Sequence, residues 1–274
     1  MKKGFLLVLI LCMVVLGGCL IPKGKKIDAY DIGILVSLGI QEIEVYEPLN
    51  ITILSTGDEL IDFHENREGS YIRDINTYTL SSLAKHHELN VIHKGIIKDS
   101  KEAITKAVSK AMVESDIVIL SGGSSKGEKD YTHLVFEELT QNVFTHGVSI
   151  KPGKPTILSY NSNYKTLCIG LPGHPLAAIL MFDLIIYDWY LNKTHQQRPL
   201  LYLASIAENV SSNQERETCL LVSIKQVNDE YIAYPLYSKS GHISSLEKAD
   251  GYVLIPRSQE GLKKGQKVKV EILQ

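Results

Sequence analysis

The sequence is poor in cysteine and close to neutral in charge, and both shortages exclude classes of function. Four of the 274 residues are cysteine. Cys12 and Cys19 lie near the N-terminus, and the remaining Cys168 and Cys219 are too few and too far apart for a zinc motif or a disulfide framework. The 29 Lys and Arg residues and the 31 Asp and Glu residues give a formal net charge of −2. The protein as a whole therefore has no positive electrostatic field that would attract nucleic acid or an acidic membrane. Any site for an anion must be formed by a local group of cations.

Several motifs of common enzymes are also missing. The nine histidines form no H-x-x-x-H or H-E-x-x-H pattern, and no motif of a nucleophilic Ser or Cys occurs, although a dispersed triad would leave no motif. The chain has neither a P-loop nor the G-x-G-x-x-G order of dinucleotide-binding folds. Its 44% hydrophobic and 22% charged residues exclude disordered, collagen-like and coiled-coil proteins. The length and composition indicate one large or two modest globular domains.

Residues 1–19 form a hydrophobic leader. Lys2 and Lys3 precede an uncharged apolar run at residues 4–16, and a Leu-Gly-Gly-Cys sequence ends the leader at Cys19. This order is typical of a secretory signal, and the run is shorter than the roughly 20 apolar residues that span a membrane. The last four residues resemble the lipobox of bacterial lipoproteins, in which the Cys19 thiol receives lipid. The alternative is a misassigned start of a cytoplasmic protein.

Strand-like and helix-like patterns alternate from residue 28 to residue 191. Asp28 can cap a short helix that ends at Leu38, and residues 42–45 alternate as a strand. Further strands are expected at residues 51–54, 91–93, 117–120, 156–158 and 167–169. Helices are expected at residues 76–85, after Asp99, before Leu139 and at residues 175–191. Such alternation predicts an α/β fold, a three-layer αβα domain with a mainly parallel sheet.

The pattern changes after Arg198. Short alternating runs follow without a long helix between them, which indicates a small all-β domain at the C-terminus. We therefore divide the chain into the leader at residues 1–19, an upstream helix and strand region at 20–46, the αβα domain at 47–196 and the β domain at 197–274.

Polar or glycine-rich segments follow four of the expected strands. They occupy residues 55–60, 98–100, 121–130 and 171–175. Ligands bind at the carboxyl ends of parallel strands, so we expect these segments to converge on one site. The segment that begins at Ser121 combines glycines with hydroxyl groups before a helix, which suits a phosphate group. His174 is the histidine that falls in such a segment.

Charged side chains in and near these segments suit phosphate chemistry. Asp58, Glu59, Asp99 and Asp130 could face one pocket, where carboxylates commonly hold Mg²⁺ against substrate oxygens. Asp99 could instead be a helix cap, because Glu102 follows at the spacing of a capping box. Residues 151–155 place two lysines on a loop stiffened by proline, which suits an oxyanion but is also typical of a solvated turn.

Six motifs, in order, resemble those of the MoeA/gephyrin family of molybdopterin molybdenumtransferases. They lie at residues 55–60, 74–76, 95–99, 121–131, 151–155 and 171–175. Residues 240–246, 249–251 and 255–256 resemble the final β domain of the family, which implies a small β-barrel-like domain at the C-terminus. The family's N-terminal domains have no counterpart in the sequence, and His174, Ala177 and Gly147 replace a common Asn, Ser and Lys. Ser124 and Lys126 replace apolar residues of the glycine-rich loop.

The resemblance implies a reaction and a set of site residues. The reaction is the Mg²⁺-dependent insertion of molybdate into adenylylated molybdopterin, with release of AMP. The acidic active-site residues would be Glu59, Asp99 and Asp130, of which Asp99 and Asp130 would hold Mg²⁺. The substrate would be bound by Thr56, Gly57, Asp58, Gly122, Gly123, Ser125, Lys151, Lys154 and Arg216. Of these, Gly122, Gly123 and Ser125 would cradle the phosphate of the pterin, and the two lysines would line the oxyanion site.

The resemblance also implies partners and a location. We expect a cytoplasmic homodimer without a nucleic-acid partner, and another protein could supply the N-terminal domain. A lipoprotein anchored in the membrane through Cys19 is the alternative location. The alternative functions are a molybdopterin-binding or scaffold protein without turnover and a molybdopterin adenylyltransferase, against which the C-terminal β domain weighs. The sequence does not distinguish molybdenum from tungsten.

Overall fold

The chain folds into two compact units. A computed structural model describes residues 21–122, 131–196, 198, 201–212, 215–237, 243 and 246–273. One unit combines Met1–Glu47 with Asp188–Arg198, and the other combines Pro48–Tyr187 with Pro199–Gln274. Within the described residues, no helix is both long enough and apolar enough to cross a membrane.

The larger unit contains a six-stranded sheet in the order β4-β1-β5-β9-β8-β6. Its strands are β1 (Asn50–Thr56), β4 (Asn90–Ile97), β5 (Ile117–Gly122), β6 (Val143–His146), β8 (Ile157–Asn161) and β9 (Thr166–Leu171). The strand β8 runs antiparallel to both of its neighbours, and the pairings among β4, β1, β5 and β9 are all parallel. The prediction of a mainly parallel sheet is confirmed.

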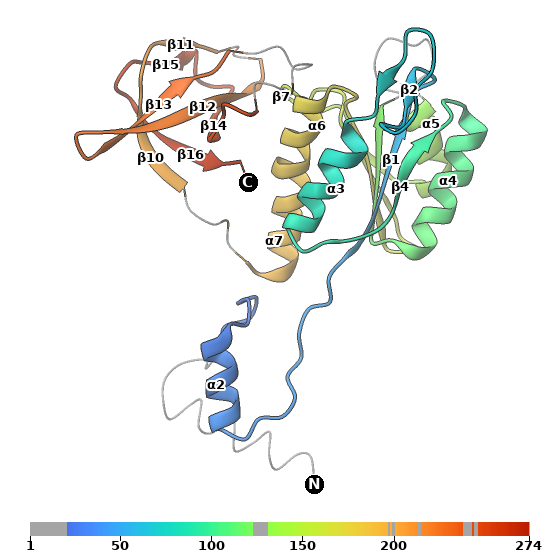
Figure 1. Cartoon of the computed structure of the whole chain (residues 1–274), viewed down its shortest axis with the longest axis horizontal. Coiled ribbons are helices and arrows are strands. Elements are labelled where there is room, and N and C mark those ends of the chain that lie inside the picture. Colours follow the sequence, from blue (N-terminus) through green and yellow to red (C-terminus); the bar gives the residue numbers. More distant parts are fainter. Residues whose placement is uncertain are drawn as a thin grey trace. The chain divides into compact units, whose positions relative to one another are not determined.

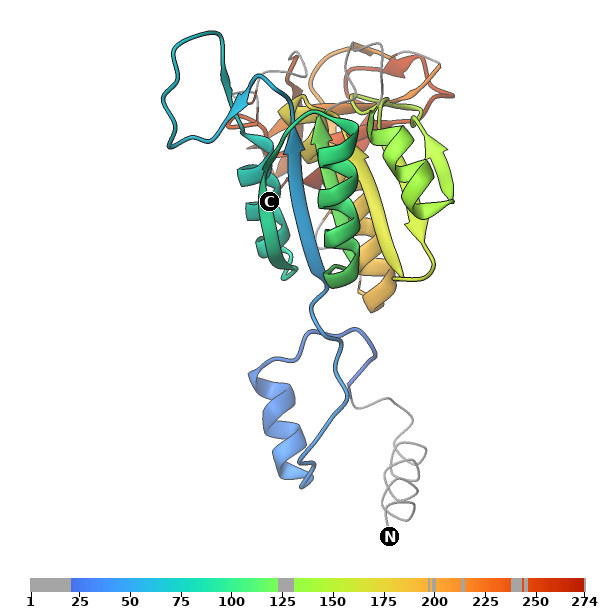
Figure 2. The same ribbon diagram turned by 90° about the vertical axis from the view of Figure 1, so that its right-hand side faces the viewer.

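Helices cover both faces of this sheet (Figures 1 and 2). The helices α4 (Lys101–Glu114) and α5 (Tyr131–Thr140) lie on one face, and α3 (Asn76–His86) and α6 (Pro175–Met181) lie on the other. Ile104, Val108 and Met112, spaced at a helical period, bury one side of α4 in a core that includes Leu120 and Phe136. The three-layer αβα arrangement is therefore as the alternating pattern predicts.

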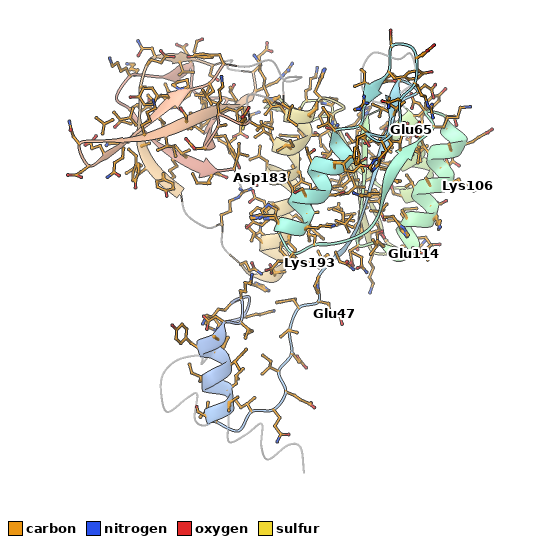
Figure 3. All side chains as sticks on the ribbon, in the orientation of Figure 1. Glu47, Glu65, Lys106, Glu114, Asp183 and Lys193 are labelled. Atoms are coloured by element: carbon orange, nitrogen blue, oxygen red, sulfur yellow. The ribbon has the colours of Figure 1, made fainter. Side chains whose placement is uncertain are left out.

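The predicted helix at residues 175–191 is interrupted. A π-helical segment, η1 (Phe182–Tyr187), follows α6, and α7 (Asp188–Thr194) comes next in the chain. A π-helical turn inserts an extra residue into the helical repeat and changes the direction of the side chains after it. Asp183 is buried in η1 and reaches toward the C-terminal β domain (Figure 3).

The C-terminal domain is a closed β barrel, which confirms both the all-β domain that the alternating runs predict and the barrel-like form that the resemblance implies. The strands β10 (Leu201–Ile206), β12 (Glu217–Val227), β13 (Glu230–Pro235), β14 (Gly251–Ile255) and β16 (Lys267–Ile272) follow the order β13-β10-β16-β14-β12. The barrel closes because β13 also pairs with β12. Val222, Val253, Ile255 and Val270 belong to its buried core.

Five strands of two residues each complete the sheets of the described structure. A two-residue strand of the αβα domain, β7 (Ile150–Lys151), extends the barrel sheet by pairing in parallel with β12. The strand β11 (Val210–Ser211) pairs with β15 (Gly261–Leu262), and β2 (Leu60–Ile61) pairs with β3 (Ile72–Arg73). The segment between β2 and β3 is tied to α3, because the Tyr78 hydroxyl donates a 2.6 Å hydrogen bond to Asp62. That bond raises the pKa of Tyr78 to about 12.

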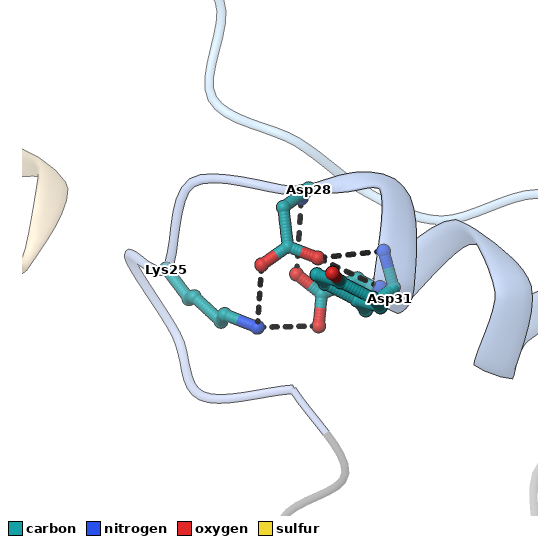
Figure 4. Close-up of polar contacts among 4 residues, drawn as sticks. Lys25, Asp28 and Asp31 are labelled. Atoms are coloured by element: carbon teal, nitrogen blue, oxygen red, sulfur yellow. Dashed lines mark hydrogen bonds and ion pairs between the residues drawn. The ribbon is translucent and has the colours of Figure 1, made fainter.

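The smaller unit contains the short helix α2 (Ala29–Ser37), which begins as predicted (Figure 4). The Asp28 side chain accepts hydrogen bonds from the backbone N–H groups of Tyr30 and Asp31, and the Asp31 side chain accepts one from the N–H of Asp28. Lys25 pairs with both carboxylates. This reciprocal capping box supplies partners for N–H groups that the first turn leaves free. The strand predicted at residues 42–45 is wrong, because that segment pairs with no other strand in the described structure.

Tyr252 links the barrel to η1. Its ring is fully buried, and its hydroxyl oxygen lies 2.6 Å from Asp183 Oδ2 and 2.7 Å from Glu271 Oε2. Replacing Tyr252 by phenylalanine removes the one buried O–H donor that lies between the two carboxylates, so we expect the free energy of unfolding to fall by about 1–3 kcal/mol. Urea unfolding followed by circular dichroism measures this loss. The matched variant Tyr231→Phe, at an exposed position of β13, should change stability by less than about 0.5 kcal/mol. Equal losses in the two variants would contradict the role of the buried hydroxyl.

Candidate functional site

The four polar segments singled out in the sequence begin at one edge of the parallel sheet, as far as the described residues show. Thr56 at the end of β1 pairs with Ile97 of β4 and with Gly122 of β5, and Ser121 pairs with Leu171 at the end of β9. The segments that follow these strands therefore start side by side. This is the expected position for a ligand site in an open parallel sheet.

Asp99 turns toward β1. The Thr56 hydroxyl donates a 3.0 Å hydrogen bond to Asp99 Oδ1, and the backbone N–H of Asp99 lies 3.4 Å from Asp58 Oδ1. The interpretation of Asp99 as a helix cap is wrong, because Ser100 caps α4 through a bond from the N–H of Ala103 to its hydroxyl oxygen. Two carboxylates and one hydroxyl are thus brought together where β1 and β4 end.

Glu59 folds back over the turn that follows β1. The backbone N–H of Leu60 donates to the carbonyl oxygen of Gly57 and closes this turn. A Cβ atom at Gly57 would lie 2.8 Å from Glu59 Oε1, so the carboxylate rests against the glycine backbone. A side chain at position 57 would therefore shift the Glu59 carboxylate from this position.

A cavity of about 370 Å³ opens beside these residues. We call it the acidic cavity because Glu59 and Asp74 are among its lining residues. The other polar or glycine positions in its wall are Ser55, Thr56, Arg73, Asn76, Ser121, Gly122, Gly173 and His174. Of the predicted site residues, Thr56, Glu59 and Gly122 line it directly. Asp99 is connected to it through the Thr56 hydroxyl, and Asp58 in turn through the backbone N–H of Asp99.

Asp74 and Asn76 are residues to which the sequence analysis gave no role. Ser55 donates a 2.9 Å hydrogen bond to Asp74 Oδ1, and Asn76 Nδ2 donates to Ser121 Oγ and to the carbonyl oxygen of Gly173. Both residues are buried and both line the acidic cavity. The motif at residues 74–76 was the signal that could have identified them.

A second cavity, of about 560 Å³, is lined by cations. Lys151, Lys154 and Arg216 all contribute to its wall, together with apolar side chains such as Leu220 and Leu221. We call it the cationic cavity. The pairing of β7 with β12 builds it, because Thr218 lies opposite Lys151 and Arg216 comes two residues earlier in the chain. The structure thus brings together three predicted site residues that are separated in sequence.

The loop that follows β9 lies between the two cavities. His174 lines both of them, Pro172 lines the cationic cavity, and Gly173 and Pro175 line the acidic one. This loop also approaches β5 closely, since a Cβ atom at Gly173 would lie 3.6 Å from the Cα of Gly122. A ligand that extends past His174 could therefore contact carboxylates at one end and ammonium groups at the other.

The remaining predicted site residues, Gly123, Ser125 and Asp130, lie outside the described residues. Among the residues that are described, no group of three or more His, Cys, Asp or Glu side chains is arranged to hold a metal ion. Burial raises the pKa of the Cys168 thiol to about 12 and, with Asp183 and Glu271 nearby, also raises the pKa of Cys219. Both thiols are therefore poor nucleophiles at neutral pH.

Comparisons with known proteins agree with this architecture. Residues 52–192 match the family model described as "Probable molybdopterin binding domain", and residues 204–273 match "MoeA C-terminal region (domain IV)". A protein of Methanocaldococcus jannaschii named for molybdopterin biosynthesis is 35% identical over 94% of this chain and 63% of its own length. A molybdopterin molybdenumtransferase of Nostoc is 28% identical over 93% of this chain and 60% of its own length.

A solved structure has the same fold over most of the chain. The molybdopterin biosynthesis protein MoeA of Pyrococcus horikoshii superimposes with a TM-score of 0.78 at 30% identity, over 93% of this chain and 62% of that protein. The chain thus spans about three fifths of the length of the relatives it matches. The matched domains, their order and the shared fold show that this chain belongs to the MoeA family.

Proposed function

We propose that this protein inserts molybdate into adenylylated molybdopterin and releases AMP. The observation that carries the proposal is the junction of the acidic and cationic cavities at the loop of His174. The reaction needs a binding site for an oxyanion and, next to it, a site where the pyrophosphate bond of the substrate is cleaved. The relatives named above act in molybdopterin biosynthesis, which supports a pterin as the substrate.

The cationic cavity suits molybdate or a phosphate group. Lys151, Lys154 and Arg216 offer three positive groups within one concave wall, and molybdate is a dianion. Loop proline residues at positions 152 and 155 limit the backbone freedom of the two lysines, so less entropy is lost when an anion binds. These residues would hold and orient the oxyanion.

The oxygen-rich end of β1 suits Mg²⁺. The Asp99 carboxylate, the Thr56 hydroxyl and the neighbouring Asp58 carboxylate are hard oxygen donors, and Mg²⁺ commonly takes one or two carboxylates together with substrate phosphates. Asp99 and Asp130 would hold the ion, with Asp58 in support. When bound, the ion neutralises negative charge on the phosphoryl oxygens during cleavage.

Two other predicted residues have roles that follow from their positions. Glu59 is exposed at the acidic cavity and can orient a water molecule or accept a proton from it. Gly122 lets a phosphate group approach the backbone at the end of β5, and Gly123 and Ser125 would continue this cradle.

Incubation of the purified full chain with adenylylated molybdopterin, Mg²⁺ and molybdate tests the proposal. We expect AMP, measured by chromatography, and molybdenum-loaded cofactor in equal amounts, and neither product when molybdate is omitted. Tight pterin binding without AMP release would identify a scaffold protein instead. ATP-dependent adenylylation of molybdopterin would identify an adenylyltransferase, against which the match to the MoeA C-terminal region weighs.

The cellular setting stays a prediction. The homodimer, the protein that supplies an N-terminal domain and the cytoplasmic location rest on the resemblance alone, and the expected lack of a nucleic-acid partner rests on the near-neutral charge. The alternative of a lipoprotein anchored at Cys19 concerns residues outside the described structure.

A further inference from the structure

Two residues that line the acidic cavity each carry a buried acceptor atom without a hydrogen-bond partner. These atoms are Asp74 Oδ2 and Asn76 Oδ1, on residues that are 4% and 6% exposed. Within the described residues, Thr132 Oγ1 is the one other buried side-chain atom in this condition, and Thr132 does not line either cavity. An unsatisfied buried acceptor is costly, so two beside one cavity point to a ligand that donates hydrogen bonds there.

The orientation of the Asp74 carboxylate is fixed by its other oxygen. Oδ1 accepts a 2.9 Å hydrogen bond from the Ser55 hydroxyl and a 3.1 Å bond from the backbone N–H of Thr77. The Ser55 and Thr77 hydroxyl groups also lie 2.9 Å apart, which holds the Ser55 side chain in place. Oδ2 is therefore the oxygen left for a ligand.

The orientation of the Asn76 amide is fixed as well. Its Nδ2 donates a 2.7 Å bond to Ser121 Oγ and a 2.9 Å bond to the carbonyl oxygen of Gly173. A carbonyl oxygen can only accept, so a flipped amide would place two acceptors against each other. Oδ1 is thereby held as an acceptor.

We propose that Asp74 and Asn76 recognise the 2-amino-4-oxopyrimidine edge of a pterin. This edge carries a ring N–H beside an exocyclic amino group, so it presents the neighbouring donors that two acceptor atoms require. The amino group of adenine, by contrast, lies beside a ring nitrogen that accepts. The inference rests on the proposed function, because it assigns one end of the proposed substrate to one end of the site.

Ligand-observed NMR with two small probes tests this assignment on the wild-type protein. The probes are 6-hydroxymethylpterin and 6-hydroxymethyllumazine, which differ in carrying an amino group or an oxygen at C2. We expect the pterin to bind about tenfold more tightly or better, since a site built to accept from an N–H group rejects an acceptor in its place. Equal affinities, or no pterin binding at millimolar concentration, would overturn the proposal.

The variant Asp74→Asn gives a sharper test. Ser55 and Thr77 donate to Oδ1, so the new amide keeps its oxygen there and places its NH₂ group where Oδ2 was. The preference should then reverse toward the lumazine. The matched control is Asp116→Asn, which changes a carboxylate before β5, at the other end of that strand, where Oδ2 accepts from the backbone N–H of Asn50. The control should keep the preference for the pterin.

Other outcomes separate the two proposals. If Asp74→Asn weakens both probes equally, or changes the affinity for AMP and leaves both probes unaffected, the pterin assignment is wrong. A protein that releases no AMP in the turnover assay but still discriminates the two probes keeps the pterin assignment and loses the proposed reaction. Thermal melting of each variant without ligand shows whether it is folded, and the wild-type comparison requires no variant at all.

Discussion

Asp99→Asn should lower the rate of AMP release by about 100- to 1000-fold, the range seen when one charge-stabilising group is removed from an active site. The asparagine keeps an oxygen that can accept the hydrogen bond from the Thr56 hydroxyl, so the local structure should persist. What is lost is the negative charge that we propose for holding Mg²⁺. The loss should appear mainly in kcat and in a higher requirement for Mg²⁺, measured by AMP release across a Mg²⁺ titration.

The control for this variant is Glu102→Gln. Glu102 is exposed in the first turn of α4, three residues from Asp99, and it takes no part in either cavity. Its AMP release should stay within about twofold of the wild type, because surface changes of this kind have small effects. If Asp99→Asn turned over at the wild-type rate, Asp99 would be a structural residue and the proposed metal ligand would be wrong.

Gly122→Ala should destabilise the protein more than any other single change that we consider. Gly122 has a φ of +101°, a conformation that side chains rarely adopt, and a Cβ atom there would lie 2.2 Å from the carbonyl oxygen of Thr56. Backbone strain and overpacking each cost about 1–3 kcal/mol, so we expect a total loss of about 2–5 kcal/mol in the free energy of unfolding. Urea unfolding measures it.

Gly173→Ala is the matched comparison at the same site. Its new methyl group would meet the Cα of Gly122 at 3.6 Å, an ordinary contact distance. We expect a loss below about 1 kcal/mol for this variant. Similar losses in both variants would show that the close approach of Gly122 to β1 is not what constrains this position.

The sheet was predictable because its central strands are buried on both faces. The residues of β1 from Ile51 on, and all of β9, are buried, so these strands appear in the sequence as short segments rich in apolar residues. The convergence of the polar segments was predictable for a different reason, because the carboxyl ends of parallel strands lie at one edge of the sheet. Once the strands were located, the meeting of Thr56, Asp99 and Gly122 followed.

Other features depend on contacts between distant parts of the chain. The strand β7 is two residues long, and its pairing with β12 has no local signal, yet it brings Arg216 to the cavity of Lys151. The alternation at residues 42–45 predicted a strand that finds no partner in the described structure. The π-helical segment likewise has no local signal, and its Asp183 contacts Tyr252 of the barrel, 69 residues later in the chain.

The helix cap shows a different limit. Both Asp99 and Ser100 are good capping residues, so local propensity could not choose between them. The choice is made by Thr56, 43 residues earlier, whose hydroxyl binds Asp99 and leaves Ser100 at the start of α4. The residue that looked structural is thus the one that is available for a ligand.

The pairing of β7 with β12 has an energetic consequence for the molecule as a whole. Lys151 and Lys154 belong to the αβα domain and Arg216 to the barrel, so the cationic cavity exists when these two domains are docked. An anion that binds all three cations acts as a bridge between the domains. By thermodynamic linkage, contact between the two domains and binding of the anion favour each other by the same free energy. The oxyanion that we propose as a substrate would then also be a cohesive element of the tertiary structure.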